Sequence, residues 1–151
     1  MKLSKKKIIN LALLFMWMGL IFYMSSSNGE KSTGQSDLVI TILSSVGINL
    51  SGNFGEFASV IVRKAAHICE YMILSLLLYN VLKDYITITK KAMIYTIIGV
   101  ILYAMSDELH QAFVPGRAGR IQDVFIDTTG GCIGLVVINV INKIKRSRST
   151  I

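Results

Sequence analysis

Ionisable and polar side chains recur at helical spacing within three apolar stretches of this sequence. Side chains three or four residues apart lie on the same face of a helix. The residues that follow this rule are Arg63, His67 and Glu70 in one stretch, Asp107, His110 and Gln111 in the next, with Glu108 beside them, and Arg120, Asp123 and Asp127 in the last. With Arg117 added and Arg120 left out, these residues are the predicted ligand-binding site.

The cationic members of this set are suited to binding an anion. Arg63, Arg117 and Arg120 could donate charge-assisted hydrogen bonds to a phosphate or a carboxylate. They could instead pair with the neighbouring carboxylates and only hold the helices in register. That second interpretation is strongest for Arg63 and Glu70, which lie near the end of one helix.

The imidazole and carboxyl groups could also move protons, so the question of an enzyme stays open. The catalytic candidates are His67, Glu70, Asp107 and His110, with a histidine as base and a carboxylate orienting it. No GxSxG or P-loop motif is present, and Ser106 is a candidate nucleophile only by adjacency. Two histidines with several carboxylates could hold a divalent metal, but no recognised ligand spacing is present. The sequence therefore predicts no metal and no other cofactor.

The elements that carry these residues are long enough and apolar enough to cross a membrane. Apolar residues make up 52% of the 151-residue chain, and its mean hydropathy is +0.56. About 20 apolar residues of helix cross the hydrocarbon core. We therefore predict an all-α, integral membrane four-helix bundle. Its helices are expected at about 8–24, 62–82, 92–113 and 121–141.

The depth of the acidic residues makes them informative. Pro115 and Gly116 are expected to stop the third helix. Counted from Ala92, Asp107 lies about 22 Å along that helix, still below the outer interface. A charge at such depth costs about 2.5 kcal/mol or more unless it is paired or hydrated. The three polar faces should therefore turn inward and form a pocket that opens to the outside.

Basic residues set the expected orientation. Eleven of the sixteen basic residues lie on alternate loops: before the first helix, between the second and third, and after the fourth. Of the nine acidic residues, Asp84 alone lies on that side. Basic loops stay in the cytoplasm, so both termini are predicted to be cytoplasmic. This placement also argues against nucleic acid as the partner of the net +7 charge.

Two further segments carry predictions. The long first external segment could form short interfacial helices over Leu38–Val46 and Phe54–Ile61. Gly130 and Gly134 form a GxxxG spacing, which lets helix backbones approach closely. We expect this spacing to serve packing within the bundle, with a homodimer contact as the alternative.

Several of these motifs together resemble the signature of the VanZ-like family. The residues are the run Ser106–Arg117, which reads SDELHQAFVPGR; the continuation Ile121–Asp127 with the glycines at 130, 131 and 134; Arg63–His67 followed by Glu70 and Tyr71; and Ser25 and Ser26. Asp127 stands where that family often has Asn, which leaves open whether this position needs a charge or only a hydrogen bond. The resemblance covers nearly the whole chain and implies one domain over residues 1–151.

The resemblance implies a bacterial cell-membrane protein linked to resistance against teicoplanin and related glycopeptides. Three mechanisms fit this expectation. The protein could bind a lipid-linked wall precursor, or the lipoglycopeptide itself, among membrane lipids. It could be a membrane enzyme that modifies a lipid-linked envelope substrate. It could also be a small transporter, although four helices are few for a transport pathway unless the protein dimerises.

Overall fold

The computed structural model describes residues 4–148, and over that range its secondary structure is helical, with turns and loops between the helices and no strand. The six helices are α1 (Lys5–Ser25), α2 (Gly29–Ser45), α3 (Leu50–Phe54), α4 (Phe57–Leu82), α5 (Thr89–Gln111) and α6 (Ile121–Arg148). Helices α1, α4, α5 and α6 are each long and apolar enough to span a membrane. The predicted all-α bundle with four spanning helices is confirmed.

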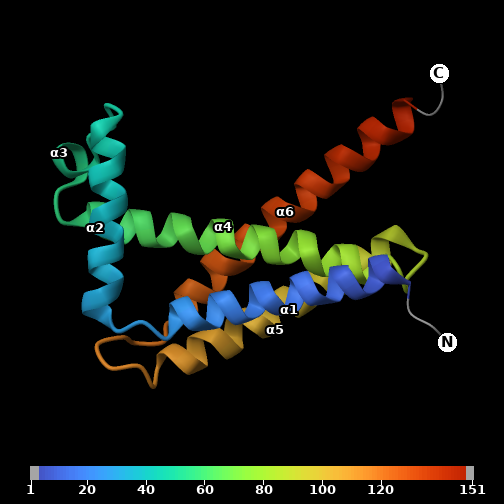
Figure 1. Ribbon diagram of the computed structural model, residues 1–151, viewed down its shortest axis with the longest axis horizontal. Coiled ribbons are helices and arrows are strands. Elements are labelled where there is room, and N and C mark those ends of the chain that lie inside the picture. Colours follow the sequence, from blue (N-terminus) through green and yellow to red (C-terminus); the bar gives the residue numbers. More distant parts are fainter. Residues whose placement is uncertain (1–3, 149–151) are drawn as a thin grey trace.

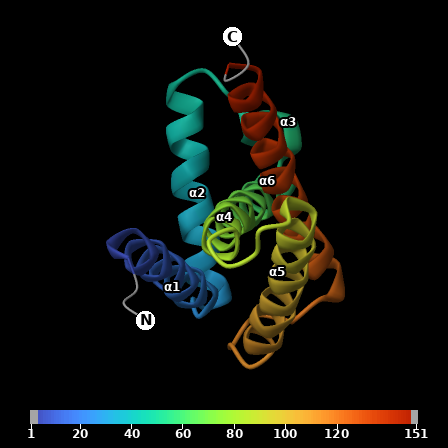
Figure 2. The ribbon, with the colours of Figure 1, turned by 90° about the vertical axis from the view of Figure 1, so that its right-hand side faces the viewer.

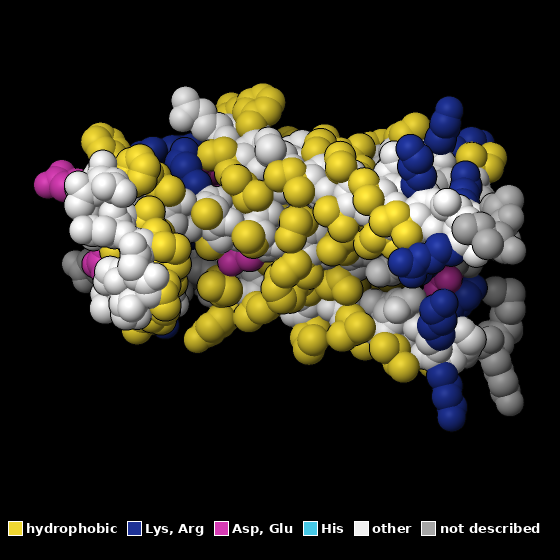
Figure 3. Space-filling view, turned by 90° about the horizontal axis from the view of Figure 1, so that it is seen from above, with side chains coloured by type: hydrophobic (Ala, Val, Ile, Leu, Met, Phe, Trp, Pro, Cys, Tyr) yellow, Lys and Arg dark blue, Asp and Glu magenta, His cyan; other side chains and the backbone are white. Residues whose placement is uncertain are grey.

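The apolar side chains of these four helices point mainly outward. At most 33% of the most apolar window of any of them is buried, and Phe15 and Met16 of α1 remain about two-thirds exposed. Figure 3 shows hydrophobic side chains covering the middle of the molecule. Such a surface suits lipid and not water, so the chain is a multi-pass membrane protein.

Lys and Arg side chains gather at one end of this apolar belt (Figure 3). Both ends of the described chain lie at that same end, opposite α2 (Figure 1). The basic residues concerned begin α1, link α4 to α5 and end α6. Lys2, one of the eleven basic residues on which the predicted orientation depends, lies outside the described residues.

The ends of the spanning helices differ from the expected ones by a few residues. Helix α4 begins at Phe57 and not at Val62, α5 ends at Gln111, and α6 continues to Arg148. The sequence predicts a separate interfacial helix over Phe54–Ile61, and hydropathy ends the last helix before Lys143. Lys and Arg are good helix formers, so the α6 helix continues through its basic end.

The segment between the first two spanning helices contains a longer helix than expected. Asn28 caps α2 by accepting a hydrogen bond from the backbone N–H of Lys31 at 2.9 Å, so the helix starts nine residues before Leu38 and includes polar sequence. The second expected segment, 54–61, is shared between the last residue of α3 and the start of α4. Figure 1 shows α2 crossing the end of the bundle at a steep angle to α4.

Close packing of α6 on α4 depends on glycine. A Cβ at Gly130 would collide with the backbone carbonyl of Ile68, and one at Gly134 would lie 2.7 Å from that of Met72. Gly131 faces Val100 of α5 in the same way. The GxxxG spacing therefore serves packing within one chain. Figure 2 shows α4 lying between α1, α2, α5 and α6.

Candidate functional site

The Asp107 carboxylate lies at the centre of a buried polar network between α1 and α5. Its side chain is 2% exposed. Its Oδ2 accepts hydrogen bonds from the Ser25 hydroxyl at 2.8 Å and from the Gln111 side-chain amide at 2.9 Å. The amide of Gln111 also lies 3.4 Å from the Ser25 hydroxyl. The i, i+4 spacing on α5 thus brings Gln111 to Asp107, as predicted, while Ser25 comes from the end of α1.

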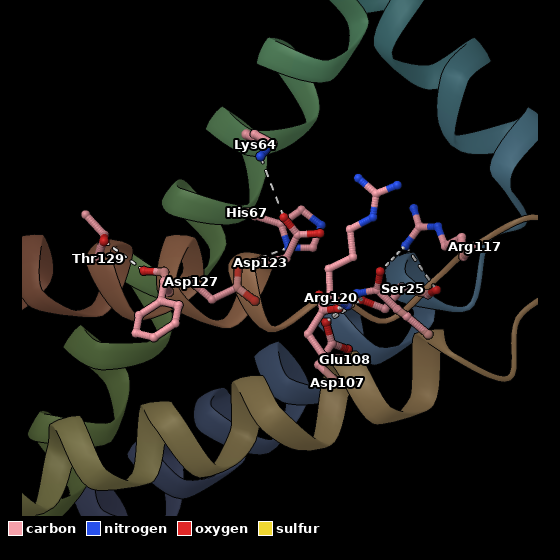
Figure 4. Close-up of polar contacts among 12 residues, drawn as sticks. Ser25, Lys64, His67, Asp107, Glu108, Arg117, Arg120, Asp123, Asp127 and Thr129 are labelled. Carbon is pink, nitrogen blue, oxygen red and sulfur yellow. Dashed lines mark hydrogen bonds and ion pairs between the residues drawn. The ribbon is translucent and has the colours of Figure 1, made fainter.

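His67 and Asp127 form the second polar contact of the site, between α4 and α6. The Nδ1 atom of His67 lies 3.1 Å from Oδ1 of Asp127. The Asp127 carboxylate is 1% exposed. Figure 4 shows the two side chains facing each other across the gap between their helices. Asp107 of α5 is close enough that ligand atoms of all three residues lie within 4.8 Å of one another.

Arg117, in the loop between α5 and α6, forms hydrogen bonds with α1 and α2. Its guanidinium donates to the Gln111 side-chain oxygen at 3.0 Å, to the Ser25 carbonyl at 3.3 Å and to the Ser32 hydroxyl at 2.7 Å. Gly116, at φ +76°, lets this loop approach α2. A Cβ on Gly29 would lie 2.6 Å from the Gly116 carbonyl oxygen.

Positive charge is concentrated where these elements meet. Burial and the neighbouring Arg63 guanidinium lower the pKa of Arg117 from its ordinary value. Arg63 donates one hydrogen bond, from Nη2 to the Thr33 hydroxyl at 3.4 Å. The Nε atoms of Arg63 and Arg117 are both buried and have no hydrogen-bond partner. Guanidinium groups with unused donors are suited to binding an anion.

A cavity of about 620 Å³ adjoins these arginines. Arg63, His67, Glu70 and Arg117 line it on one side. The remaining wall comes mainly from α1 and α2. It combines the apolar side chains of Met24, Leu38 and Val39 with small and polar residues, among them Lys31, Ser32 and Gln35. The cavity therefore has cationic side chains in the same lining as apolar side chains that hydrocarbon could contact.

A smaller cavity of about 250 Å³ lies on the other side of His67. Arg120, Asp123 and Asp127 line it together with Arg63 and His67. Lys64 makes an ion pair with Asp123 at 3.7 Å at its rim, as Figure 4 shows. His67 lines both cavities and so lies between them.

Two predicted site residues lie elsewhere. His110 stacks on Phe22 of α1, with ring centroids 4.2 Å apart, and its Nε2 lies 3.0 Å from the Ser26 hydroxyl. Glu108 accepts a hydrogen bond from the backbone N–H of Arg120 at 2.7 Å, which holds the loop before α6. Neither residue lines either cavity.

The arginines do not make the ion pairs that the sequence suggested. Among the described residues, none of Arg63, Arg117 and Arg120 has a charged nitrogen within 4.0 Å of a carboxylate oxygen of Glu70, Asp107, Glu108, Asp123 or Asp127. Arg117 and Arg63 bind neutral oxygens instead, so none of the described carboxylates neutralises their charges at close range.

Sequence reasoning missed three residues that complete the site. Ser25 and Ser32 are buried and bind Asp107 and Arg117, and the buried Tyr71 hydroxyl has no partner. Ser25 and Tyr71 belong to the motifs quoted above, but neither was assigned a contact. Ser32 begins a repeat of buried residues, Ser32, Ser36 and Ile40, that marks one face of α2.

One family matches the chain in comparisons with known proteins. The family model described as VanZ/LLP1 matches residues 10–142. No curated protein and no solved structure shows significant similarity to the chain. The matched range includes every residue of the site described above, from Ser25 to Asp127. The chain belongs to the VanZ/LLP1 family.

Proposed function

We propose that this membrane protein binds a lipid-linked, phosphate-bearing molecule of the cell envelope in its larger cavity. Through that binding it contributes to tolerance of teicoplanin-type glycopeptides in the bacterial cell membrane. The link to glycopeptides rests on the resemblance to VanZ-like proteins, and the binding mode rests on the site itself.

The observation that carries the proposal is the pair of buried, unpartnered Nε atoms of Arg63 and Arg117 beside one cavity. A buried donor left without an acceptor costs about 1–3 kcal/mol, and more when it is charged. An anion between the two guanidinium groups would satisfy both donors and reduce the repulsion between them. A phosphate suits this role because arginine binds phosphate oxygens in a bidentate manner.

The apolar side chains that line the cavity support a lipid as the carrier of that phosphate. Leu38 and Val39 of α2 and Met24 of α1 line the same cavity as the arginines. Basic residues at the other end of the bundle favour the cytoplasm, an orientation in which the cavity and α2 would lie at the outer surface. A lipid-linked wall precursor in the outer leaflet would meet the cavity with its phosphate at headgroup depth.

Titration of the purified protein, held in lipid nanodiscs, with lipid II tests the proposal. We expect saturable binding that Arg63→Gln weakens by about tenfold or more, since a hydrogen bond to a charged group contributes about 1.5–3 kcal/mol. Arg148→Gln is the matched control, because Arg148 ends α6 and lies outside both cavities. Teicoplanin, titrated separately, tests the drug itself as the ligand.

Susceptibility of a sensitive Gram-positive host then links binding to phenotype. The host carries an empty vector, the wild type, Arg63→Gln or Arg148→Gln at matched membrane levels. We expect raised teicoplanin tolerance with the wild type and Arg148→Gln only. Absence of lipid II binding would refute the binding mode. Teicoplanin tolerance that Arg63→Gln leaves unchanged would mean that the cavity is not the cause of the tolerance.

A membrane enzyme acting on a lipid-linked substrate is the second candidate function. The observation in its favour is the 3.1 Å contact between His67 and the buried Asp127, beside both cavities. A carboxylate that orients an imidazole is a common acid–base arrangement. Mass spectrometry of envelope lipids distinguishes the two functions: an altered precursor that requires His67 would favour catalysis over binding.

A further inference from the structure

The acidic residues of the site form a cluster that the anion-binding function does not use. His67, Asp107 and Asp127 come from α4, α5 and α6, and one ligand atom of each lies within 4.8 Å of the other two. The two aspartates are 2% and 1% exposed. Three potential ligands from three helices therefore meet at one buried point.

Each aspartate in this cluster has an oxygen without a partner. Ser25 and Gln111 satisfy Oδ2 of Asp107, and His67 satisfies Oδ1 of Asp127. Oδ1 of Asp107 and Oδ2 of Asp127 are buried and accept no hydrogen bond. Buried carboxylate oxygens in this state are costly, and a bound cation would satisfy both.

The nearby lysine and arginine side chains interact with groups outside this cluster. Lys64 pairs with Asp123, Arg63 donates to Thr33, and Arg117 donates to Ser25, Gln111 and Ser32. No described lysine or arginine lies within 4.0 Å of a carboxylate oxygen of Asp107 or Asp127. The protein thus supplies the cluster with negative charge and an imidazole, but with no lysine or arginine at close range.

We propose that His67, Asp107 and Asp127 bind a divalent transition-metal ion, Mn²⁺ or Zn²⁺. Imidazole with carboxylates is the ligand set expected for these ions: imidazole suits zinc and carboxylate suits manganese. Ligands about 2.0–2.2 Å from a zinc ion lie roughly 3–3.5 Å from one another in tetrahedral geometry. The 3.1 Å separation of His67 Nδ1 and Asp127 Oδ1 falls in that range, so the ion can replace the proton of their hydrogen bond.

The position of the cluster gives the ion access to a ligand. His67 lines both cavities and Asp127 lines the smaller one. Three protein ligands leave a coordination position open, and this position can accept an oxygen of a phosphate held by the arginines. The inference goes beyond the proposed lipid binding, because the ion is bound by residues other than Arg63 and Arg117.

Titration with the metal ion alone tests the inference. The purified protein is stripped with a chelator and titrated with Mn²⁺ and with Zn²⁺, followed by calorimetry and by elemental analysis. We expect one ion per chain with one of the two metals, and an affinity reduced about tenfold or more by His67→Gln or Asp107→Asn. Losing even an outer-shell group costs roughly 10–100-fold in metal affinity.

Glu108→Gln is the matched control, because Glu108 is next to Asp107, is similarly buried at 5% exposure, and contacts Arg120 instead of the cluster. It should bind the ion as the wild type does. With Mn²⁺, pulsed electron paramagnetic resonance should show a nitrogen coupling from His67 that His67→Gln removes. This signal identifies the ligand even if Asp107→Asn were to unfold.

Absence of stoichiometric binding of either ion to the folded wild type would overturn the inference. So would an affinity that the cluster variants leave unchanged, or a Mn²⁺ signal without nitrogen coupling. Lipid II titration of the metal-free protein is a separate readout, since it reports on the arginines. Failure of one proposal is therefore distinguishable from failure of the other.

Discussion

The Ser25 hydroxyl shows how a single neutral group can stabilise a buried carboxylate. It donates to Asp107 at 2.8 Å and is itself 3% exposed. Ser25→Ala removes this donor and leaves Gln111 as the remaining partner of Oδ2. We expect a loss of about 1–3 kcal/mol in unfolding free energy, measured by denaturant titration in detergent micelles.

A conservative variant separates the hydrogen bond from the space that the side chain fills. Ser25→Thr keeps the hydroxyl and should regain most of the lost stability. Ser26→Ala is the control at the neighbouring position, because Ser26 is exposed and its hydroxyl contacts Phe22 and His110 instead of Asp107. Equal destabilisation by Ser25→Ala and Ser26→Ala would contradict the role of the Asp107 contact.

His110 is a predicted site residue that lines neither cavity in the structure. Its ring stacks on Phe22 at 4.2 Å. His110→Phe keeps an aromatic ring there and should leave lipid II affinity within about twofold of the wild type, whereas Arg63→Gln reduces it strongly. A large loss of lipid II affinity in His110→Phe, measured in the same nanodisc titration, would mean that His110 takes part in binding.

The sequence identifies many of the site residues, but it does not predict most of their hydrogen-bond partners. Helical spacing correctly brought Gln111 to Asp107, because that contact depends on one helix alone. The contacts of Asp127 with His67 and of Asp107 with Ser25 join residues 60 and 82 positions apart. Such contacts depend on how the helices pack, which local spacing does not specify.

At the scale of elements, glycine decides how closely α6 approaches α4. A methyl group at Gly134 would collide with Ser75 and lie 2.7 Å from the Met72 carbonyl. Gly134→Ala should therefore push α6 away from α4 and destabilise the bundle by about 1–3 kcal/mol, the typical cost of overpacking. Thermal unfolding in micelles, followed by circular dichroism, measures the change.

Gly19→Ala is the matched control for this prediction. Gly19 lies within α1, and a Cβ there would have nothing within 4 Å. Alanine has the higher helix propensity, by about 1 kcal/mol, so Gly19→Ala should be neutral or slightly stabilising. A Gly134→Ala variant as stable as Gly19→Ala would mean that α6 does not pack closely on α4.

The spanning helices could be predicted from the sequence, but the start of α2 could not. Hydropathy marks α1, α4, α5 and α6 because each contains an 18-residue window of high mean hydropathy, close to the length that crosses a membrane. The first half of α2 carries no such signal; its buried face is made of Ser32 and Ser36. Small polar residues pack there because α2 lies across α4 at the end of the bundle, a tertiary feature that local sequence does not reveal.

At the scale of the whole molecule, charge and shape point to one orientation in the membrane. The chain crosses the bundle four times, so both described ends lie at the same end, where Lys and Arg gather (Figure 3). Helix α2 and the cavities lie at the opposite end (Figure 1). Because basic ends favour the cytoplasm, we expect the proposed ligand site to open to the outside.

Single-cysteine labelling of intact cells tests this orientation. In a background of Cys69→Ala and Cys132→Ala, we expect a membrane-impermeant maleimide to label Ser45→Cys, at the exposed end of α2, without permeabilisation. Ser147→Cys, near the exposed end of α6, should be labelled only after the membrane is opened. The reverse pattern would turn the cavity toward the cytoplasm, where an outer-leaflet precursor and an external drug could not reach it, and the proposed function would fail with it.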